Sequence, residues 1–156
     1  MPRRGKVIRL EPPPDAKYAN ETLAKFINRM MLRGQKATAE KIVYSAFALI
    51  EKETKQHPLE IFEQAVKNAT PLLQVKPRRV AGATYQVPLA VPPGKGQAIA
   101  LRWLINSARS KKGRSMAERL ASELSEAARG EGVTIKRRED LHHMAEANRA
   151  FVHYRW

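Results

Sequence analysis

The sequence contains no cysteine, and this absence excludes disulfide bridges and thiolate metal sites. It also lacks an apolar run of membrane-spanning length, and its basic N-terminal residues are not followed by the apolar segment of a signal peptide. We therefore expect a cytoplasmic protein. Its 156 residues, 43% of them hydrophobic, are enough for a single domain, 1–156, with a modest core.

Acidic residues are missing from about a third of the chain. Between Gln64 and Ala117, a span of 54 residues, there is no Asp or Glu, whereas ten Lys or Arg occur. This acid-free span contributes most of the formal net charge of +14. A protein that only needs to stay soluble mixes its charges, so this segregation indicates a surface that binds a polyanion.

Apolar residues recur at helical spacing in six segments that are separated by turn and capping signals. The expected helices run from the N-cap Asn20 toward Gly34, through 39–50, from Pro58 to Ala69, from Gln97 to Arg109, from the capping box Ser115–Glu118 to about Gly130, and from about Arg137 into the C-terminal segment 137–156. Residues 1–15, which are rich in arginine and contain three consecutive prolines, predict an extended basic arm.

The stretch VKPRRVAGATYQVPLAVPP, residues 75–93, has the alternation of a β-hairpin. A turn centred on Ala81-Gly82-Ala83 places Val75 and Tyr85 on one face and Lys76 and Gln86 on the other. Prolines in both runs prevent a further strand from pairing, so the ribbon, expected over 72–91, must lean on something other than a sheet. The predicted fold is mostly α: a six-helix bundle with a protruding two-stranded β-hairpin between the third and fourth helices.

Three cations lie within four residues, at Lys76, Arg78 and Arg79, and they predict that this ribbon contacts the phosphate backbone of RNA. The ring of Tyr85 could stack on one of the bases. Two other polyanions remain open. An anionic membrane is the weaker alternative, because no strongly basic helix carries Trp or Phe on its opposite face. A DNA-binding architectural protein could use the ribbon in a groove with a proline wedge, although the prolines lie within the strands and not at the tip.

The C-terminal segment invites a metal or acid–base interpretation, from which a metal-dependent nuclease is a third hypothesis. It gathers Glu139, Asp140, His142, His143, Glu146 and His153. Their spacing matches no zinc-protease signature, and carboxylates and histidines on a helix are more often solvated surface, so we assign no catalytic residue, metal or cofactor. The rings of Tyr154 and Trp156 are expected to dock on the last helix, with the arginines Arg149 and Arg155 outward.

Five stretches together resemble the bacterial form of the seventh small-subunit ribosomal protein family. They are AKFINRMMLRGQKATAEKIVYSA at 24–46, RRVAGATYQVPL at 78–89, ALRWLINSAR at 100–109, SMAERLASEL at 115–124 and MAEANRAFVHYRW at 144–156. The resemblance implies six helices with a hairpin between the third and fourth. It also implies a structural, non-enzymatic protein that binds the three-prime major domain of small-subunit ribosomal RNA and helps nucleate assembly of the head. In this family the protein lies near the tRNA exit site and the messenger path, and some members repress their own messenger.

The resemblance also implies which residues face each partner. Those expected to contact ribosomal RNA are Arg3, Arg4, Lys6, Arg9, Arg33, Lys36, Lys76, Arg78, Arg79, Gln86, Lys95 and Arg102, and the cationic loop residues Arg109, Lys111, Lys112 and Arg114 join them because of their charge. Those expected beside exit-site tRNA and a neighbouring protein are Gly82, Tyr85, Arg149, Tyr154, Arg155 and Trp156. The implied partners include the eleventh and ninth small-subunit proteins, and the free protein is expected to be a monomer that binds no membrane.

The chain departs from the family pattern at two places. The family usually has paired glycines at the hairpin tip, where this chain has Ala81-Gly82, and a positive φ would strain Ala81. The family also commonly has an arginine pair ahead of the fourth helix. Here that place is taken by Gly94-Lys95-Gly96, which leaves one point charge.

Overall fold

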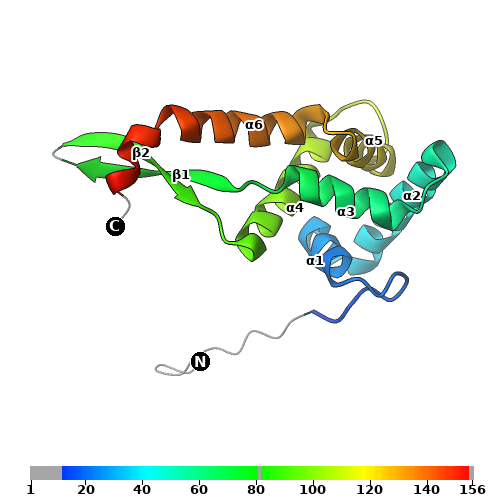
Figure 1. The fold of residues 1–156 in the computed structure, drawn as a ribbon. Helices are drawn as coiled ribbons and strands as arrows, with labels where there is room; N and C mark the ends of the chain where they lie inside the picture. The colour runs from blue at the N-terminus through cyan, green and yellow to red at the C-terminus, as the bar shows by residue number, and fades with distance from the viewer. Residues whose placement is uncertain (1–11, 81, 155–156) are drawn as a thin grey trace, which may run out of the picture. The chain divides into compact units, whose positions relative to one another are not determined.

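The computed structural model describes residues 12–80 and 82–154. The predicted arm cations Arg3, Arg4, Lys6 and Arg9, the tip residue Ala81, and the terminal Arg155 and Trp156 lie outside these residues. The described elements are α1 (Glu21–Met30), α2 (Lys36–Thr54), α3 (Pro58–Ala69), β1 (Leu73–Val80), β2 (Ala83–Ala90), α4 (Pro93–Ser110), α5 (Met116–Ala128), α6 (Gly132–Ala147) and the 3-10 helix η1 (Arg149–Tyr154). The predicted fold class is confirmed: the chain is mostly helical, with one hairpin between α3 and α4 (Figure 1).

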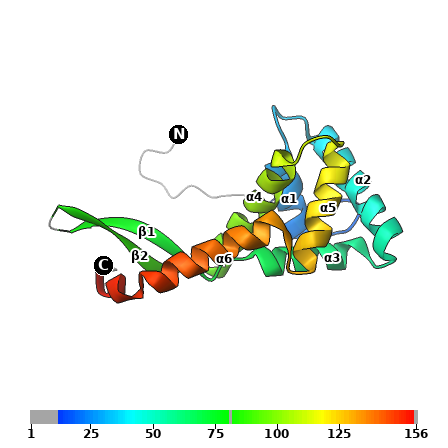
Figure 2. The same ribbon diagram turned by 90° about the horizontal axis from the view of Figure 1, so that it is seen from above.

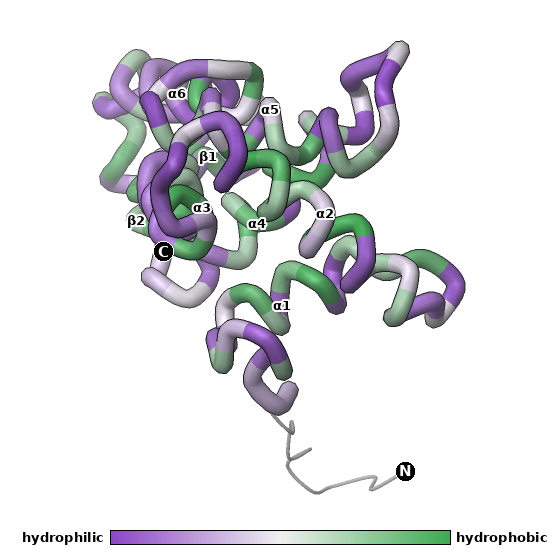
Figure 3. Tube along the Cα trace, turned by 90° about the vertical axis from the view of Figure 1, so that its right-hand side faces the viewer, coloured by the Kyte–Doolittle hydropathy of each residue, from purple (hydrophilic) through white to green (hydrophobic). Residues whose placement is uncertain are grey.

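The chain divides into two compact units, Met1–Glu40 and Lys41–Trp156. In the first unit, the predicted N-cap Asn20 accepts the Leu23 N–H at 3.0 Å, which satisfies one of the free donors at the start of α1. Hydrophobic and hydrophilic residues alternate along α1 with helical spacing (Figure 3), and the apolar residues Phe26 and Ile27 are buried. The helix ends at Met30, and Gly34 follows in the turn with a φ of +77°.

The core of the second unit is formed by the apolar stripes of its helices. Phe47 of α2 and Phe62 of α3 are both completely buried, with ring centroids 5.8 Å apart. Each such side chain stabilises the fold by roughly 1.5–3 kcal/mol through its burial. A partly buried polar contact also joins α3 to α5: the Asn68 Nδ2 donates to the last carbonyls of α5, Ala127 O at 3.0 Å and Ala128 O at 2.9 Å. The last carbonyls of a helix lack donors from a following turn, so Asn68, together with the Gly130 N–H that donates to Ala127 O at 3.1 Å, caps the end of α5.

The hairpin turn is shorter than predicted, and this changes the two faces of the ribbon. Val80 pairs with Ala83, so the turn contains two residues, and Gly82 in it has a φ of +87° that favours glycine. A change of one residue in register exchanges the faces of one strand relative to the other. Lys76 is therefore paired with Val87 and Arg78 with Tyr85. The predicted separation of Lys76 and Arg78 from the face of Tyr85 was wrong.

The ribbon leans on the C-terminal part of the chain, as its prolines predicted for a hairpin without a sheet. Helix α6 lies alongside β1, and η1 packs on β2 (Figures 1 and 2). The Tyr85 ring lies 4.8 Å from Phe151 and 5.7 Å from Tyr154 between centroids, and Val87 is completely buried. Because an isolated two-stranded hairpin is marginal in water, these contacts hold the ribbon's shape.

Three helices begin earlier than predicted, and α2 does so by three residues, at Lys36. Helix α4 starts at Pro93 and not at Gln97, because a proline is well suited to the first helical position, where no N–H donor is needed. Helix α6 starts at Gly132 and not near Arg137, and it ends at Ala147, so the residues from Arg149 to Tyr154 form the separate helix η1. The early start of α6 depends on a partner distant in sequence, because the buried Glu123 of α5 accepts the Thr134 N–H at 3.2 Å.

Gly96 is required for the close approach of α4 to the corner between α3 and β1. A Cβ atom at this position would lie 3.0 Å from Thr70 Cγ2 and 3.1 Å from Pro71 O, neither of which can move easily. We expect Gly96→Ala to lower the free energy of unfolding by about 1–3 kcal/mol, measured by urea denaturation. The matched control is Gly94→Ala, two residues earlier, where no atom lies within 4 Å of the added methyl. Equal stabilities of the two variants would contradict the argument.

Candidate nucleic-acid interface

Three cations form a line along the exposed side of α4. Lys95, Arg102 and Arg109 are all exposed and lie seven residues apart, so they point in nearly the same direction with about 10.5 Å between successive positions. We call them the α4 stripe. Burial of Leu101 and Leu104 on the opposite side of the helix fixes this orientation. The first turn of α4 contains no acidic residue, so Lys95 adds its charge to the positive end of the helix dipole, an arrangement that favours an anion.

The ribbon presents its predicted RNA contacts on both faces. Arg79 and Gln86 are exposed on the face opposite Tyr85, whereas Lys76 is exposed on the same face as Tyr85. Arg78 is half-buried beside Tyr85. The ribbon therefore carries cations on both faces, and of these Lys76 and Arg79 are exposed whereas Arg78 is partly covered by the protein.

The loop between α4 and α5 exposes two of its cations and holds the third, which is half-buried, in an ion cluster. Lys112 and Arg114 are exposed, but the Lys111 Nζ lies 2.9 Å from Glu126 Oε1 and 3.0 Å from Glu123 Oε2. Burial disfavours the charge of Lys111, but its hydrogen bonds to Glu126 and Glu123 outweigh this effect and raise its pKa above the ordinary 10.5. Lys111 thus stays charged with its ammonium directed inward, and we leave it out of the candidate interface.

The first unit carries two of the predicted RNA contacts. Arg33 is exposed in the turn between α1 and α2, with a φ of +53°. Lys36 begins α2 and forms an exposed ion pair with Glu40 at 3.7 Å. A pair of this kind contributes little to stability, so it leaves Lys36 able to exchange its partner for a phosphate.

Of the residues predicted to lie beside tRNA and a neighbouring protein, those that the structure describes lie on the ribbon and on η1. Gly82 is exposed in the turn, and the rings of Tyr85 and Tyr154 are stacked on each other. The Tyr154 ring is thus docked on the ribbon, so the predicted docking on the last helix was wrong about its partner. Arg149 is largely exposed and pairs with Glu146 at 3.3 Å.

The histidine segment serves to attach α6 to the root of the ribbon. The His142 Nε2 accepts the Leu72 N–H at 3.1 Å, and one helical turn earlier Arg138 donates to the Asn68 carbonyl. Burial, followed by the nearby positive charge of Arg138, lowers the pKa of His142, which favours the neutral ring that this hydrogen bond requires. Within residues 12–80 and 82–154, no three His, Asp or Glu side chains are placed to hold a metal ion. Sequence reasoning missed Arg138, whose partner is 70 residues away in the chain.

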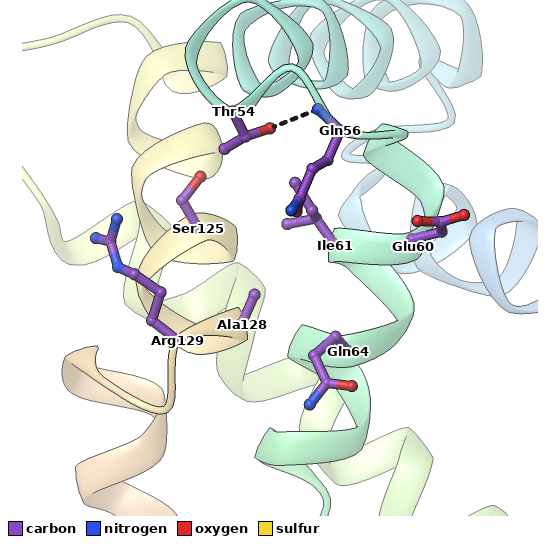
Figure 4. Close-up of a pocket in the computed structure, with 8 residues that line it drawn as sticks. All are labelled: Thr54, Gln56, Glu60, Ile61, Gln64, Ser125, Ala128 and Arg129. Carbon is purple, nitrogen blue, oxygen red and sulfur yellow. Dashed lines mark hydrogen bonds between the residues drawn. The ribbon is translucent and has the colours of Figure 1, made fainter.

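A groove of about 460 Å³ lies between α3 and α5 (Figure 4), and no residue of the α4 stripe lines it. Gln64 and Ile61 line it from α3, and Ser125 and Arg129 from α5. No hydrogen-bonded pair of nucleophile and base lies among its residues, so the groove has no arrangement typical of acyl transfer or hydrolysis. No helix in the described ranges is long and apolar enough to cross a membrane.

Comparisons with known proteins identify one family. Residues 2–149 match the family model described as ribosomal protein S7p/S5e. Three relatives named small ribosomal subunit protein uS7 align over all 156 residues, which is 100% of each chain: those of Thermomicrobium roseum at 56% identity, Dictyoglomus thermophilum at 55% and Carboxydothermus hydrogenoformans at 52%. Because the family model covers nearly the whole chain and these relatives share more than half of its residues, the chain belongs to the ribosomal protein S7p/S5e family.

Proposed function

We propose that this protein is a structural component of the small ribosomal subunit and binds ribosomal RNA through its exposed cations, most of which lie in the second unit. The observation that carries the proposal is the acid-free span, because it builds the ribbon, the α4 stripe and the loop that follows them. A phosphate backbone approaching these elements meets Arg and Lys and no carboxylate from the elements themselves. The names of the relatives support the assignment to the small subunit.

The proposed RNA contacts of the described residues are exposed Lys and Arg side chains, together with the half-buried Arg78 and the exposed amide of Gln86. They are Arg33, Lys36, Lys76, Arg78, Arg79, Gln86, Lys95, Arg102, Arg109, Lys112 and Arg114. We propose the three-prime major domain of the ribosomal RNA as their target, with a role in nucleating assembly of the head. The far end of the ribbon with η1 is the proposed side for exit-site tRNA, the messenger path and the eleventh protein, with the ninth protein also nearby. The proposed location is the cytoplasmic ribosome, and the proposed role is not enzymatic.

The DNA-architectural alternative is not favoured by the ribbon. Pro88 is buried, and the exposed Pro77 lies in the middle of β1 and not at the tip, so neither is placed to wedge between base pairs. The Tyr85 ring is already covered by Phe151 and Tyr154.

Filter binding between 50 and 200 mM salt tests the proposal. We expect tight binding to the three-prime domain of small-subunit RNA, with log K falling against log salt with a slope of about −4 or steeper, because several phosphates are contacted. Unlabelled random RNA should compete poorly. Equal competition by random RNA would contradict specific binding to small-subunit RNA. Stronger competition by duplex DNA would favour the DNA-binding architectural protein instead.

A further inference from the structure

The ammonium group of Lys111 is held by three side chains of α5. Its Nζ donates to Ser122 Oγ at 3.0 Å and to both oxygens of Glu126 at 2.9 Å, and it pairs with Glu123 Oε2 at 3.0 Å. The Ser122 hydroxyl in turn donates to Glu126 Oε1 at 2.6 Å. An ammonium has three protons to donate, and these acceptors use its full capacity. Lys111 is thus a fixed point of the loop although both neighbouring cations, Lys112 and Arg109, are exposed.

Arg119 of α5 holds the backbone of the same loop. One of its guanidinium nitrogens, Nη1, donates to the Lys111 carbonyl and, at 3.3 Å, to the Arg109 carbonyl. These carbonyls lie at the C-terminal end of α4, where no donor within the helix is available. The side chain and the backbone of Lys111 are therefore both fastened to α5.

The cluster is anchored in the core. Glu123 is completely buried, and its Oε1 accepts both the Thr134 N–H and, at 2.6 Å, the Thr134 hydroxyl at the start of α6. The loop is thus tied through α5 to α6. By contrast, the next loop residue, Lys112, is exposed, and Gly113 turns the chain with a φ of +85° and open space around it.

We propose that Lys111, Arg119 and Glu126 are positioning residues that hold the loop 109–114 in its RNA-binding shape, and that Arg109, Lys112 and Arg114 make the contacts. This inference rests on the proposed RNA-binding function. Its physical basis is that a surface held rigid before binding loses less conformational freedom when it binds. The carboxylate of Glu126 then favours binding of a polyanion because it fixes the loop, although its negative charge by itself would weaken that binding.

The decisive variant is therefore Glu126→Gln, which adds one unit of positive net charge. Long-range electrostatics alone predicts tighter RNA binding, whereas positioning predicts binding about threefold weaker. Lys111→Met keeps the length of the side chain but removes the ammonium, and we expect binding about tenfold weaker. In both variants the slope of log K against log salt should match that of the unaltered protein, because no phosphate contact is lost.

Two controls separate positioning from contact. Lys112→Gln should make the salt slope shallower by about one unit, as expected for a lost phosphate contact. Glu131→Gln makes the same charge change as Glu126→Gln at a largely exposed carboxylate and should tighten binding slightly. Tighter binding by Glu126→Gln, or a shallower slope for Lys111→Met, would overturn the proposal. If Lys111→Met does not fold, Ser122→Ala tests the same cluster with a smaller change.

Hydrogen exchange of the free protein distinguishes failure of this inference from failure of the proposed function. Amides of residues 111–114 should exchange faster in Glu126→Gln than in the unaltered protein, whether or not RNA binds. Unchanged exchange would overturn the positioning role. Absence of RNA binding by the unaltered protein would instead overturn the proposed function and leave the loop result intact.

Discussion

Replacing the α4 stripe by glutamine, as Lys95→Gln, Arg102→Gln and Arg109→Gln together, is expected to weaken binding to small-subunit RNA by about a hundredfold at 0.15 M salt. Each cation that meets a phosphate releases counterions, so the slope of log K against log salt should become shallower by about two to three units. Glutamine keeps a good helix propensity, so α4 itself should remain folded. Filter binding at several salt concentrations measures both quantities.

A matched control removes the same charge from another part of the protein. Lys41, Lys52 and Lys136 are exposed on α2 and α6, outside the acid-free span. Changing all three to glutamine lowers the net charge equally, and we expect only a few-fold loss of affinity. If the control triple and the stripe triple lose affinity to the same extent, net charge and not the α4 stripe governs binding.

The largest expected loss of stability comes from Glu123→Ala. This change leaves the buried Thr134 N–H and hydroxyl without their acceptor and removes one of the two carboxylates from Lys111. Breaking a buried ionic contact by removing one partner typically lowers the free energy of unfolding by about 3–5 kcal/mol. Urea denaturation followed by circular dichroism should show this loss, with the midpoint moving to lower urea.

Two further variants test the cause of this loss. Glu123→Gln keeps an oxygen acceptor for Thr134 but removes the charge, so it should be clearly more stable than Glu123→Ala. Glu139→Ala removes a largely exposed carboxylate whose pair with Arg138 is 3.4 Å long, and it should change stability by less than about 0.5 kcal/mol. A Glu123→Ala variant as stable as Glu139→Ala would show that the buried cluster does not hold α6 in place.

Features that depend on neighbours in sequence could be predicted. The capping residues Asn20 and Ser115 each accept the N–H three residues ahead, and Pro58 opens α3 as expected. The acid-free span can likewise be recognised from the sequence alone, and the structure adds which side of α4 carries its cations. In each case the relevant physical interaction spans at most a few residues.

Features that depend on distant partners could not be predicted. Lys111 was expected to face RNA because its charge resembles that of Lys112, but its carboxylate partners are 12 and 15 residues further along the chain. The start of α6 was missed for the same reason, since its cap comes from Glu123 of another helix. The faces of the ribbon were wrong because a single residue in the turn decides the register, and alternation alone fits a turn of two or three residues equally well.

The aromatic contacts of the ribbon determine when, during synthesis, the ribbon can fold stably. The strands β1 and β2 are complete at Ala90, but their partners Phe151 and Tyr154 follow about 60 residues later in the chain. Because a lone hairpin is marginal in water, the ribbon lacks this support until η1 has been synthesised. A nascent chain that stops before η1 has all the cations of the ribbon and the α4 stripe, yet lacks the aromatic residues that brace the ribbon.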